Sequence, residues 1–135
     1  MPSAPTIEKA TFRSGPFQAV FAQGVRVGDQ LTLAGQVSMD ESGDIVGAGD
    51  ITAQFAQAYA NVKAVLAEFG AEMGNIVDEA IYVTDFSEVM GNLDAIMAAR
   101  GDAFGGTADV SQTMVEVQGL VFPELMVEIK CVARL

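Results

Sequence analysis

The sequence predicts an α+β domain in which two amphipathic helices cover one face of a mixed sheet. Two segments repeat apolar residues every three or four positions, as helices do, and the others are short β-branched or alternating runs between turn residues. The expected order is two or three strands, a helix, a strand, a second helix and two strands. The 135 residues suffice for a single domain spanning 1–135, and no linker-like stretch divides them.

Apolar runs separated by turn residues predict the N-terminal strands, which are expected at residues 19–22, 25–27 and 31–35. The pair Gly28-Asp29 marks the turn between the last two of these strands. A polar cluster at 40–44 predicts a further turn, after which a brief edge strand is expected at 45–46. This part of the chain is therefore predicted to be β-structure without a helix.

The first helix is predicted to begin near Asp50 or Thr52, either of which can cap it, and to end before Gly70, which suits the C′ position. Its apolar stripe consists of Phe55, Tyr59, Val62, Val65, Leu66 and Phe69. The second helix is predicted over about residues 87–100, with Gly101 as its stop. One face of it also carries apolar residues, so both helices can pack on a sheet.

The remaining strands are predicted at residues 76–84, 113–117 and 126–135. In the last strand, the period of two places Cys131 on an apolar face and Glu128 and Lys130 on the opposite face. Two helices cover only one face of such a sheet, so the other face must meet water or a second subunit. Since half of the residues are apolar, we expect a subunit there and hence an oligomer.

Composition excludes several function classes. The chain has 18 acidic and 7 basic residues, a net charge of −11, and such a surface disfavours nucleic acid and anionic membranes as partners. It has no histidine, which rules out imidazole bases, histidine-bound metals and Ser-His-Asp triads. Cys131 is its one cysteine, so we expect no internal disulfide and a reducing, cytoplasmic location. No membrane span, signal peptide, metal or cofactor is expected.

Short segments along nearly the whole chain carry a family resemblance: GPFQAV at 15–20, LAGQV at 33–37, GDITAQ at 49–54, ANVKAVL at 60–66, VTDF at 83–86, VEV at 115–117 and VEIKCVA at 127–133. Together they resemble the RidA family, also called YjgF or reactive-intermediate deaminases. The resemblance implies a chorismate-mutase-like fold and a homotrimer with three ligand clefts between subunits. For the best-known members it also implies hydrolysis of 2-imino or 2-aminoacrylate-type acids to 2-oxo acids and ammonia.

The residues that the resemblance assigns to substrate binding differ from the family pattern. Gln112 stands where the deaminating members carry an arginine, and a neutral amide cannot clamp a carboxylate as a guanidinium does. Phe17 replaces a tyrosine, Ala34 a serine or threonine, and Met114 a cysteine. Gly35 is kept, and it lets a ligand approach the backbone closely. We therefore expect an apolar pocket and little activity on 2-imino acids. Without the resemblance, packing explains Phe17, Ala34 and Met114 equally well.

Glu128 is the candidate catalytic residue, because it matches the glutamate to which the resemblance assigns the attacking water or a proton relay. A partly buried carboxyl has a raised pKa and can act as acid or base. Lys130 follows about 7 Å along the same face at ~3.3 Å per residue, and its ammonium is expected to hold Glu128 ionised. The two residues are equally consistent with a solvated or interfacial ion pair.

Two functions remain open from the sequence. The first is a trimer that binds a small metabolite between subunits and hydrolyses or tautomerises an enamine, an imine or a related carbonyl compound, with Glu128 positioning water. The second is a metabolite-binding or chaperone-like trimer without turnover. A nuclease activity conflicts with the net charge of −11 and the missing histidine, so it ranks last.

Overall fold

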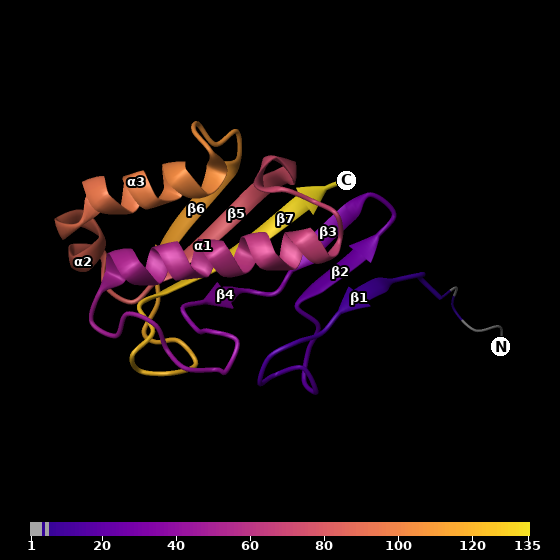
Figure 1. Cartoon of the computed structure of the whole chain (residues 1–135), viewed down its shortest axis with the longest axis horizontal. Helices are drawn as coiled ribbons and strands as arrows, with labels where there is room; N and C mark the ends of the chain where they lie inside the picture. Colours follow the sequence, from indigo (N-terminus) through magenta and orange to yellow (C-terminus); the bar gives the residue numbers. More distant parts are fainter. Residues whose placement is uncertain (1–3, 5) are drawn as a thin grey trace.

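The computed structural model describes residue 4 and residues 6–135, and in it one mixed sheet carries all of its helices on one face (Figure 1). The strands are β1 (Ala10–Phe12), β2 (Gly24–Val27), β3 (Gln30–Leu33), β4 (Gln36–Val37), β5 (Ile76–Val83), β6 (Ser111–Glu116) and β7 (Val127–Arg134). They lie in the order β1-β2-β3-β7-β5-β6, with β4 pairing β7. Only β5 and β6 pair in parallel; the other neighbours are antiparallel.

Three helices cover the sheet where the sequence predicts two: α1 (Ile51–Glu68), α2 (Phe86–Gly91) and α3 (Leu93–Phe104). A single 3₁₀ turn at Met73–Asn75 precedes β5. The predicted second helix is divided at Asn92, because its ψ of 20° interrupts the helical path directly after the flexible Gly91. The predicted stop at Gly101 is also wrong. The helix ends at Gly105, which takes the left-handed conformation with a φ of 73°.

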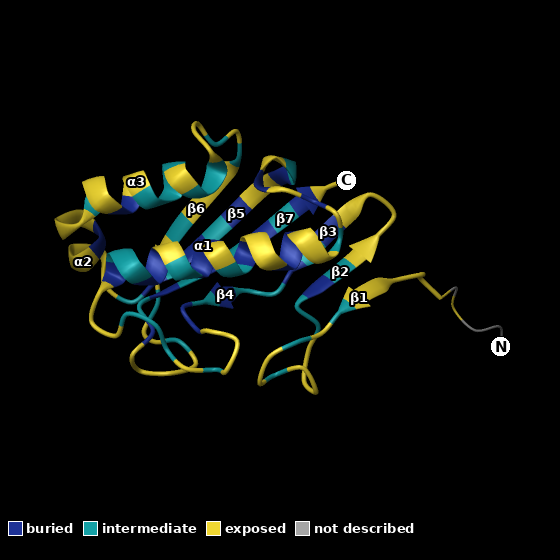
Figure 2. Cartoon of the chain, in the orientation of Figure 1, coloured by how far each residue is buried: buried dark blue, intermediate teal, exposed yellow. Residues whose placement is uncertain are grey.

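The first helix follows the prediction closely. The Asp50 side chain accepts a hydrogen bond of 3.1 Å from the backbone N–H of Ala53, as an N-cap does. Gly70, just beyond the helix, has a φ of 71°, which suits its expected C′ role. Phe55, Tyr59 and the other apolar residues of the stripe lie against the sheet, where they form the core with β5 and β7 (Figure 2). This packing fixes one side of α1 beside β4.

The N-terminal strands differ from the prediction. Residues 19–22 are not a strand: the N–H groups of Val20 and Phe21 both bond the carbonyl of Phe17, which closes a turn. Val20 is 75% exposed, so nothing in the fold uses its β-branched side chain. The strand that pairs with β2 is instead β1, which the sequence pattern missed because only Phe12 in it is partly buried.

The strand predicted over 31–35 ends at Leu33, and the chain pairs again at β4 after Ala34 and Gly35. The edge strand expected at 45–46 is reduced to a single bridge between Met39 and Ile45. The turn at 40–44 is present, because Asp40 accepts hydrogen bonds from the N–H groups of Ser42 and Asp44. The segment after β4 lies against α1, because Asn61 donates hydrogen bonds to the carbonyls of Val37 and Met39.

Strand β7 alternates as predicted, with four residues buried against the helices: Val127, Ile129, Cys131 and Ala133. Glu128 and Lys130 lie on the opposite face and are half-buried. Burial raises the pKa of the Cys131 thiol to about 12, so this cysteine is a core residue and not a nucleophile. The face without helices also carries exposed Val27 and Val115 near its two edges.

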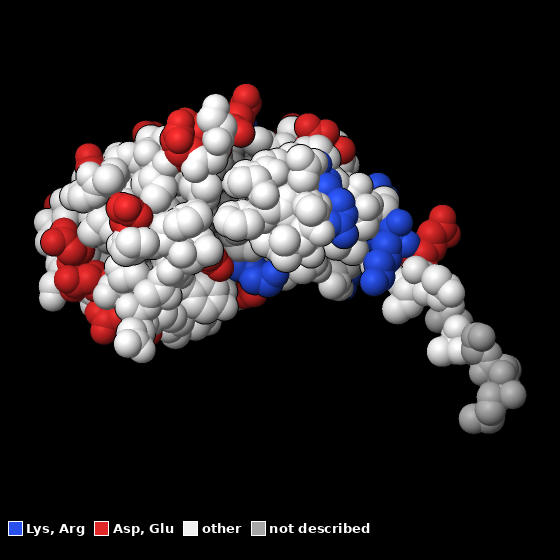
Figure 3. All heavy atoms as spheres, turned by 90° about the horizontal axis from the view of Figure 1, so that it is seen from below, with Lys and Arg blue, Asp and Glu red and all other residues white. Residues whose placement is uncertain are grey.

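Charged side chains are unevenly spread over the surface. On the face seen in Figure 3, Asp and Glu side chains are most frequent toward the end that carries α2, and the visible Lys and Arg side chains lie from the middle toward the end that carries β1, where some acidic side chains lie as well. In the part of the chain that the structure describes, no helix is long and apolar enough to cross a membrane.

Candidate functional site

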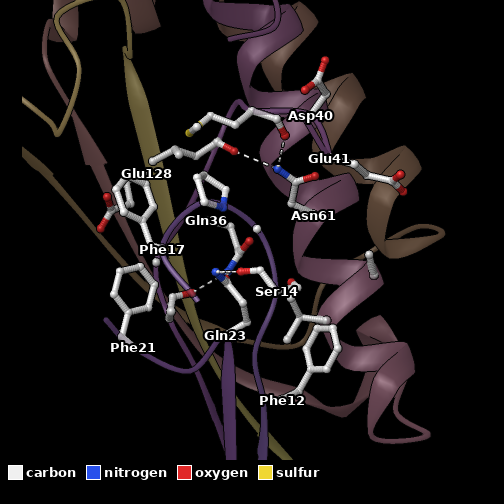
Figure 4. Close-up of a pocket in the computed structure, with 18 of the residues that line it drawn as sticks. Phe12, Ser14, Phe17, Phe21, Gln23, Gln36, Asp40, Glu41, Asn61 and Glu128 are labelled. Carbon is white, nitrogen blue, oxygen red and sulfur yellow. Dashed lines mark hydrogen bonds between the residues drawn. The ribbon is translucent and has the colours of Figure 1, made fainter. Parts of the chain in front are cut away.

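A cavity of about 760 Å³ opens between the loop that follows β1, the segment from Ala34 to Glu41, and one side of α1 (Figure 4). The loop reaches it through Ser14 to Phe17, and α1 through Asn61 and Glu68. The cavity exists because the chain leaves β3 at Leu33 and turns twice before α1, so no strand fills the space beside β4. Its size suits a small organic molecule.

Four of the predicted site residues line this cavity: Phe17, Ala34, Gly35 and Glu128. They come from three separate segments, which the fold brings together by pairing β4 with β7 and by folding the loop after β1 over them. The Phe17 ring stacks on Phe21, with ring centroids 5.8 Å apart. The aromatic replacement at position 17 therefore forms part of an apolar wall.

Gly35 makes room for the carboxyl group of Glu128. A Cβ atom on residue 35 would collide with Oε2 of Glu128, so any other residue would push the carboxyl away from its position. Gly35 thus acts through its missing side chain, and its φ is not in the left-handed region. The contact between Gly35 and Glu128 joins the segment after β3 to the face of β7 that carries Glu128 and Lys130.

Lys130 acts on Glu128 in the expected direction, but burial outweighs it. Burial raises the pKa of the Glu128 carboxyl, and the nearby Lys130 ammonium lowers it by less, so the net shift is upward. Lys130 is also engaged elsewhere, since its Nζ donates a hydrogen bond of 2.8 Å to the carbonyl of Leu33. Glu128 therefore keeps its proton to higher pH than an ordinary glutamate and can act as acid as well as base.

Gln112 and Met114 do not line the cavity within one chain. They lie on the edge strand β6, where Gln112 pairs with Glu79 and Met114 with Ile81 of β5. Met114 packs against the core beneath the helices. Nε2 of Gln112 donates a hydrogen bond of 2.9 Å to Oε1 of Glu79. The sequence alone does not predict this hydrogen bond between Gln112 and Glu79.

The model of the family described as endoribonuclease L-PSP matches residues 14–135 of the chain. The chain belongs to this family, the RidA/YjgF family. A RutC family protein from Pyrococcus abyssi is 39% identical over 71 residues, and the matched region covers 52% of this chain and 52% of that protein. The match thus spans about half the length of this curated relative.

Solved structures of the RidA/YjgF family have the same fold. The YjgF/YER057c/UK114 member Rv2704 from Mycobacterium tuberculosis is 30% identical, with a TM-score of 0.77 over 95% of this chain and 100% of that one. The Rid family protein YyfA from Yersinia pestis, described as of unknown function, is 26% identical, with a TM-score of 0.81 over 95% of this chain and 100% of that one. The predicted family is therefore confirmed, together with a mixed α+β fold.

This RidA/YjgF domain also holds a buried polar cluster that sequence reasoning missed. Glu79 is fully buried on β5 and accepts hydrogen bonds from Tyr59 (3.1 Å to Oε2), from Gln112 (2.9 Å to Oε1) and from Nε of Arg100 (2.9 Å to Oε1). Burial and the Glu79 charge raise the pKa of Tyr59, so its hydroxyl remains a donor. The alternation of β5 could have indicated that Glu79 is buried, because residue 79 lies on the same face of the strand as Ile81 and Val83.

The polar side chains deep in the cavity were missed as well. Gln36 is 7% exposed, and its Nε2 donates to Oε1 of Gln23 (2.8 Å) and to the carbonyl of Ala34 (3.0 Å). Asn61 donates through Nδ2 to the carbonyls of Val37 (2.8 Å) and Met39 (2.9 Å). Both amides lie inside segments that carry the family resemblance, which was the signal for them. They brace the strand β4 and its turn against α1.

No group of three or more Asp, Glu or Cys side chains within residues 4 and 6–135 is arranged to hold a metal ion. The cavity carboxylates come from separate elements, and the neighbouring amides have their N–H donors bound to other groups. What the arrangement offers chemically is one half-buried carboxyl with a raised pKa in an otherwise largely apolar cavity. That group can move a proton to or from a bound molecule or water.

Proposed function

We propose that the cavity binds a small enamine or imine and that Glu128 directs its hydrolysis. The observation that carries this proposal is the position of the Glu128 carboxyl, half-buried in the cavity, packed on Gly35 and raised in pKa. A group that exchanges its proton closer to neutral pH can serve both halves of a hydrolysis that first needs an acid and then a base.

The chemistry can be written with Glu128 alone as the proton carrier. The protonated carboxyl gives its proton to the imine nitrogen; for an enamine it first protonates the carbon. Water then adds to the iminium carbon while the carboxylate accepts a proton from that water. This proton is then passed to nitrogen, and the C–N bond breaks while the carboxylate accepts the hydroxyl proton, which releases a carbonyl compound and ammonia or an amine. One water is consumed, and Glu128 ends protonated, as it began.

We further propose that the active form is a homotrimer in which a neighbouring copy closes the cavity. Support comes from the face of the sheet that no helix covers, where Val27 and Val115 are exposed, and from the family resemblance. In this assembly Gln112 and Met114 stay engaged in their own chain, Gln112 through its hydrogen bond to Glu79 and Met114 through its packing on the core. Sedimentation equilibrium at micromolar concentration is expected to give three times the chain mass, and a stable monomer would contradict this assembly.

The enzymatic proposal is tested by ammonia or amine release from neutral enamines and imines, with the 2-imino acids that an amino acid oxidase generates as a second set on which little activity is expected. Glu128→Gln is expected to lower kcat/KM by roughly 100-fold or more, because an amide cannot carry the proton. Glu124→Gln is the matched control, since Glu124 is exposed and does not line the cavity. Equal activity of Glu128→Gln and wild type would overturn the role of Glu128, and bound ligand without turnover would favour the binding protein.

Ribonuclease activity is the weaker candidate, although the matching family is described by it. A net charge of −11 repels a phosphate backbone, and the chain has no histidine for acid–base chemistry on RNA. The basic side chains seen in Figure 3 lie toward the β1 end, and none of them lines the cavity.

A further inference from the structure

We infer that the cavity selects a ligand with a positively charged or N–H-rich group, a small amine or ammonium compound, over a carboxylic acid. The inference rests on the proposed function only in taking this cavity as the ligand site, and it names the chemical class that the site accepts. Three independent features of the cavity lead to it: the charge of its lining, the direction of its amide groups, and its aromatic wall.

The charged residues of the lining are all acidic. Asp40, Glu41, Glu68 and Glu128 line the cavity, and no lysine or arginine does so among the residues that the structure describes. The ammonium of Lys130 near Glu128 is bonded to the carbonyl of Leu33. A carboxylate ligand would therefore enter without a cationic partner and against several like charges, whereas an ammonium would be attracted.

The deepest polar side chain of the cavity also leaves an acceptor unbound. Gln36 is 7% exposed, and its Nε2 donates to Gln23 and to the carbonyl of Ala34. Its Oε1 accepts no hydrogen bond from the described residues, and this oxygen is not fully buried, because every fully buried side-chain N or O atom of these residues has a hydrogen-bond partner. A ligand that donates an N–H group can satisfy this oxygen, and a carboxylate cannot.

Asn61, on the α1 side, has its whole amide group bound within the protein. Both N–H groups of its amide are directed to the carbonyls of Val37 and Met39, and its Oδ1 accepts from Gln57. The amide N–H groups of Gln36 and Asn61 are thus bound within the protein. They would otherwise be the groups that could hold an anionic ligand in a cavity without cationic side chains. The side chains that remain available to a ligand are mostly acceptors: the carboxylates and Oε1 of Gln36.

The aromatic wall suits the same ligand. Phe17 and Phe21 line the cavity with rings 5.8 Å apart, and Phe12 lines it from β1 (Figure 4). In Figure 4 the two stacked rings lie on one side, while Asp40 and Glu41 lie toward the α1 side of the space. A cation held near an aromatic face gains roughly 0.5–2 kcal/mol of attraction, which an anion does not. A flat or aliphatic amine can thus pack on the rings while its nitrogen faces the carboxylates.

The test compares three probes of similar shape: benzylammonium, benzyl alcohol and benzoate, each titrated by calorimetry into the full-length protein. Benzylammonium is expected to bind most tightly and to lose affinity with added salt, and benzoate is expected to bind least. The double variant Asp40→Asn/Glu41→Gln is expected to weaken benzylammonium about two- to tenfold and to leave benzyl alcohol unchanged. Asp102→Asn/Asp109→Asn removes the same charge from exposed residues outside the cavity and is the control.

The outcomes separate this inference from the proposed function. Preference for benzoate, an unchanged benzylammonium affinity in Asp40→Asn/Glu41→Gln, or no binding of any probe at millimolar concentration overturns the inference, even if imine hydrolysis that depends on Glu128 is found. Benzylammonium binding that falls in the cavity variant but not in the control supports it, even if no substrate is ever turned over. Glu128→Gln gives a second measurement. Its loss of benzylammonium affinity is expected to be larger than the loss caused by replacing Asp40 or Glu41 alone.

Discussion

Glu79 and Glu128 are the same residue on neighbouring central strands of one sheet, on opposite faces, and the fold uses them in opposite ways. Glu79 is fully buried beneath the helices and accepts hydrogen bonds from Tyr59, Arg100 and Gln112. Glu128 is half-buried in the cavity, and no described side chain donates a hydrogen bond to it. Donors and a guanidinium bind the carboxylate oxygens of Glu79, whereas burial without such donors raises the pKa of the Glu128 carboxyl.

The difference teaches where chemistry can occur in this domain. A buried carboxylate whose two oxygens both accept hydrogen bonds within the protein has little to offer a ligand, and its value is structural. A carboxyl that burial alone shifts can exchange its proton with a bound molecule. The two glutamates should therefore respond differently to substitution and to pH.

The largest effect is expected from Glu79→Gln. The substitution keeps the shape but leaves the Arg100 guanidinium, whose side chain is 18% exposed, without its counter-ion, which costs about 3 kcal/mol in the free energy of unfolding. Glu128→Gln, the same substitution in the cavity, is expected to change this free energy far less. Urea denaturation followed by circular dichroism, at one fixed protein concentration, measures both. Similar losses in the two variants would contradict the distinction between the two glutamates.

A smaller effect is expected in the pH dependence of stability. The pKa of Glu128 is raised above its ordinary value of 4.5 in the folded protein, so the folded state binds this proton more tightly than the unfolded state. The stabilising contribution of this proton to the free energy of unfolding is therefore fully present below pH 4.5. It is lost as the pH rises through the raised pKa. The stability of wild type minus that of Glu128→Gln is expected to fall between pH 4 and neutrality. A flat or rising difference would show that Lys130 dominates.

The smallest effect on stability is expected from Gln112→Arg, below about 1 kcal/mol, because residue 112 is exposed on an edge strand. The new guanidinium lies within reach of Glu79 and is expected to pair with that carboxylate rather than with a ligand. Calorimetric titration with pyruvate should therefore show no gain in affinity over wild type. A clear gain would mean that position 112 serves a ligand cleft after all.

The sequence alone predicts the elements whose pattern is local. The apolar stripe of α1 and the alternation of β7 appear in the structure as expected, since each is set by the period of its own backbone. The run at 19–22 resembles a strand but has no partner strand, so it forms a turn instead. A strand forms only where a partner strand is available, and the sequence of a single segment does not show whether it has one.

The candidate site shows the same limit. The resemblance identified Phe17, Gly35 and Glu128, which the fold brings to one cavity. It could not give the sign of the shift at Glu128, because that depends on how deeply the residue is buried and on where the Lys130 side chain points. The partner of Gln112 is equally non-local, since Glu79 lies 33 residues earlier in the chain.

The position of β7 has a consequence for how the domain is made. This strand comes last among the strands of the sheet but lies in its middle, between β3 and β5. During synthesis on the ribosome, the hairpin of β2 and β3 and the segments β5 and β6 emerge with no strand to join them. Their exposed edges must wait for β7 to be translated, so the sheet is expected to close in one late step, and until then chaperones would have two unpaired strand edges to protect.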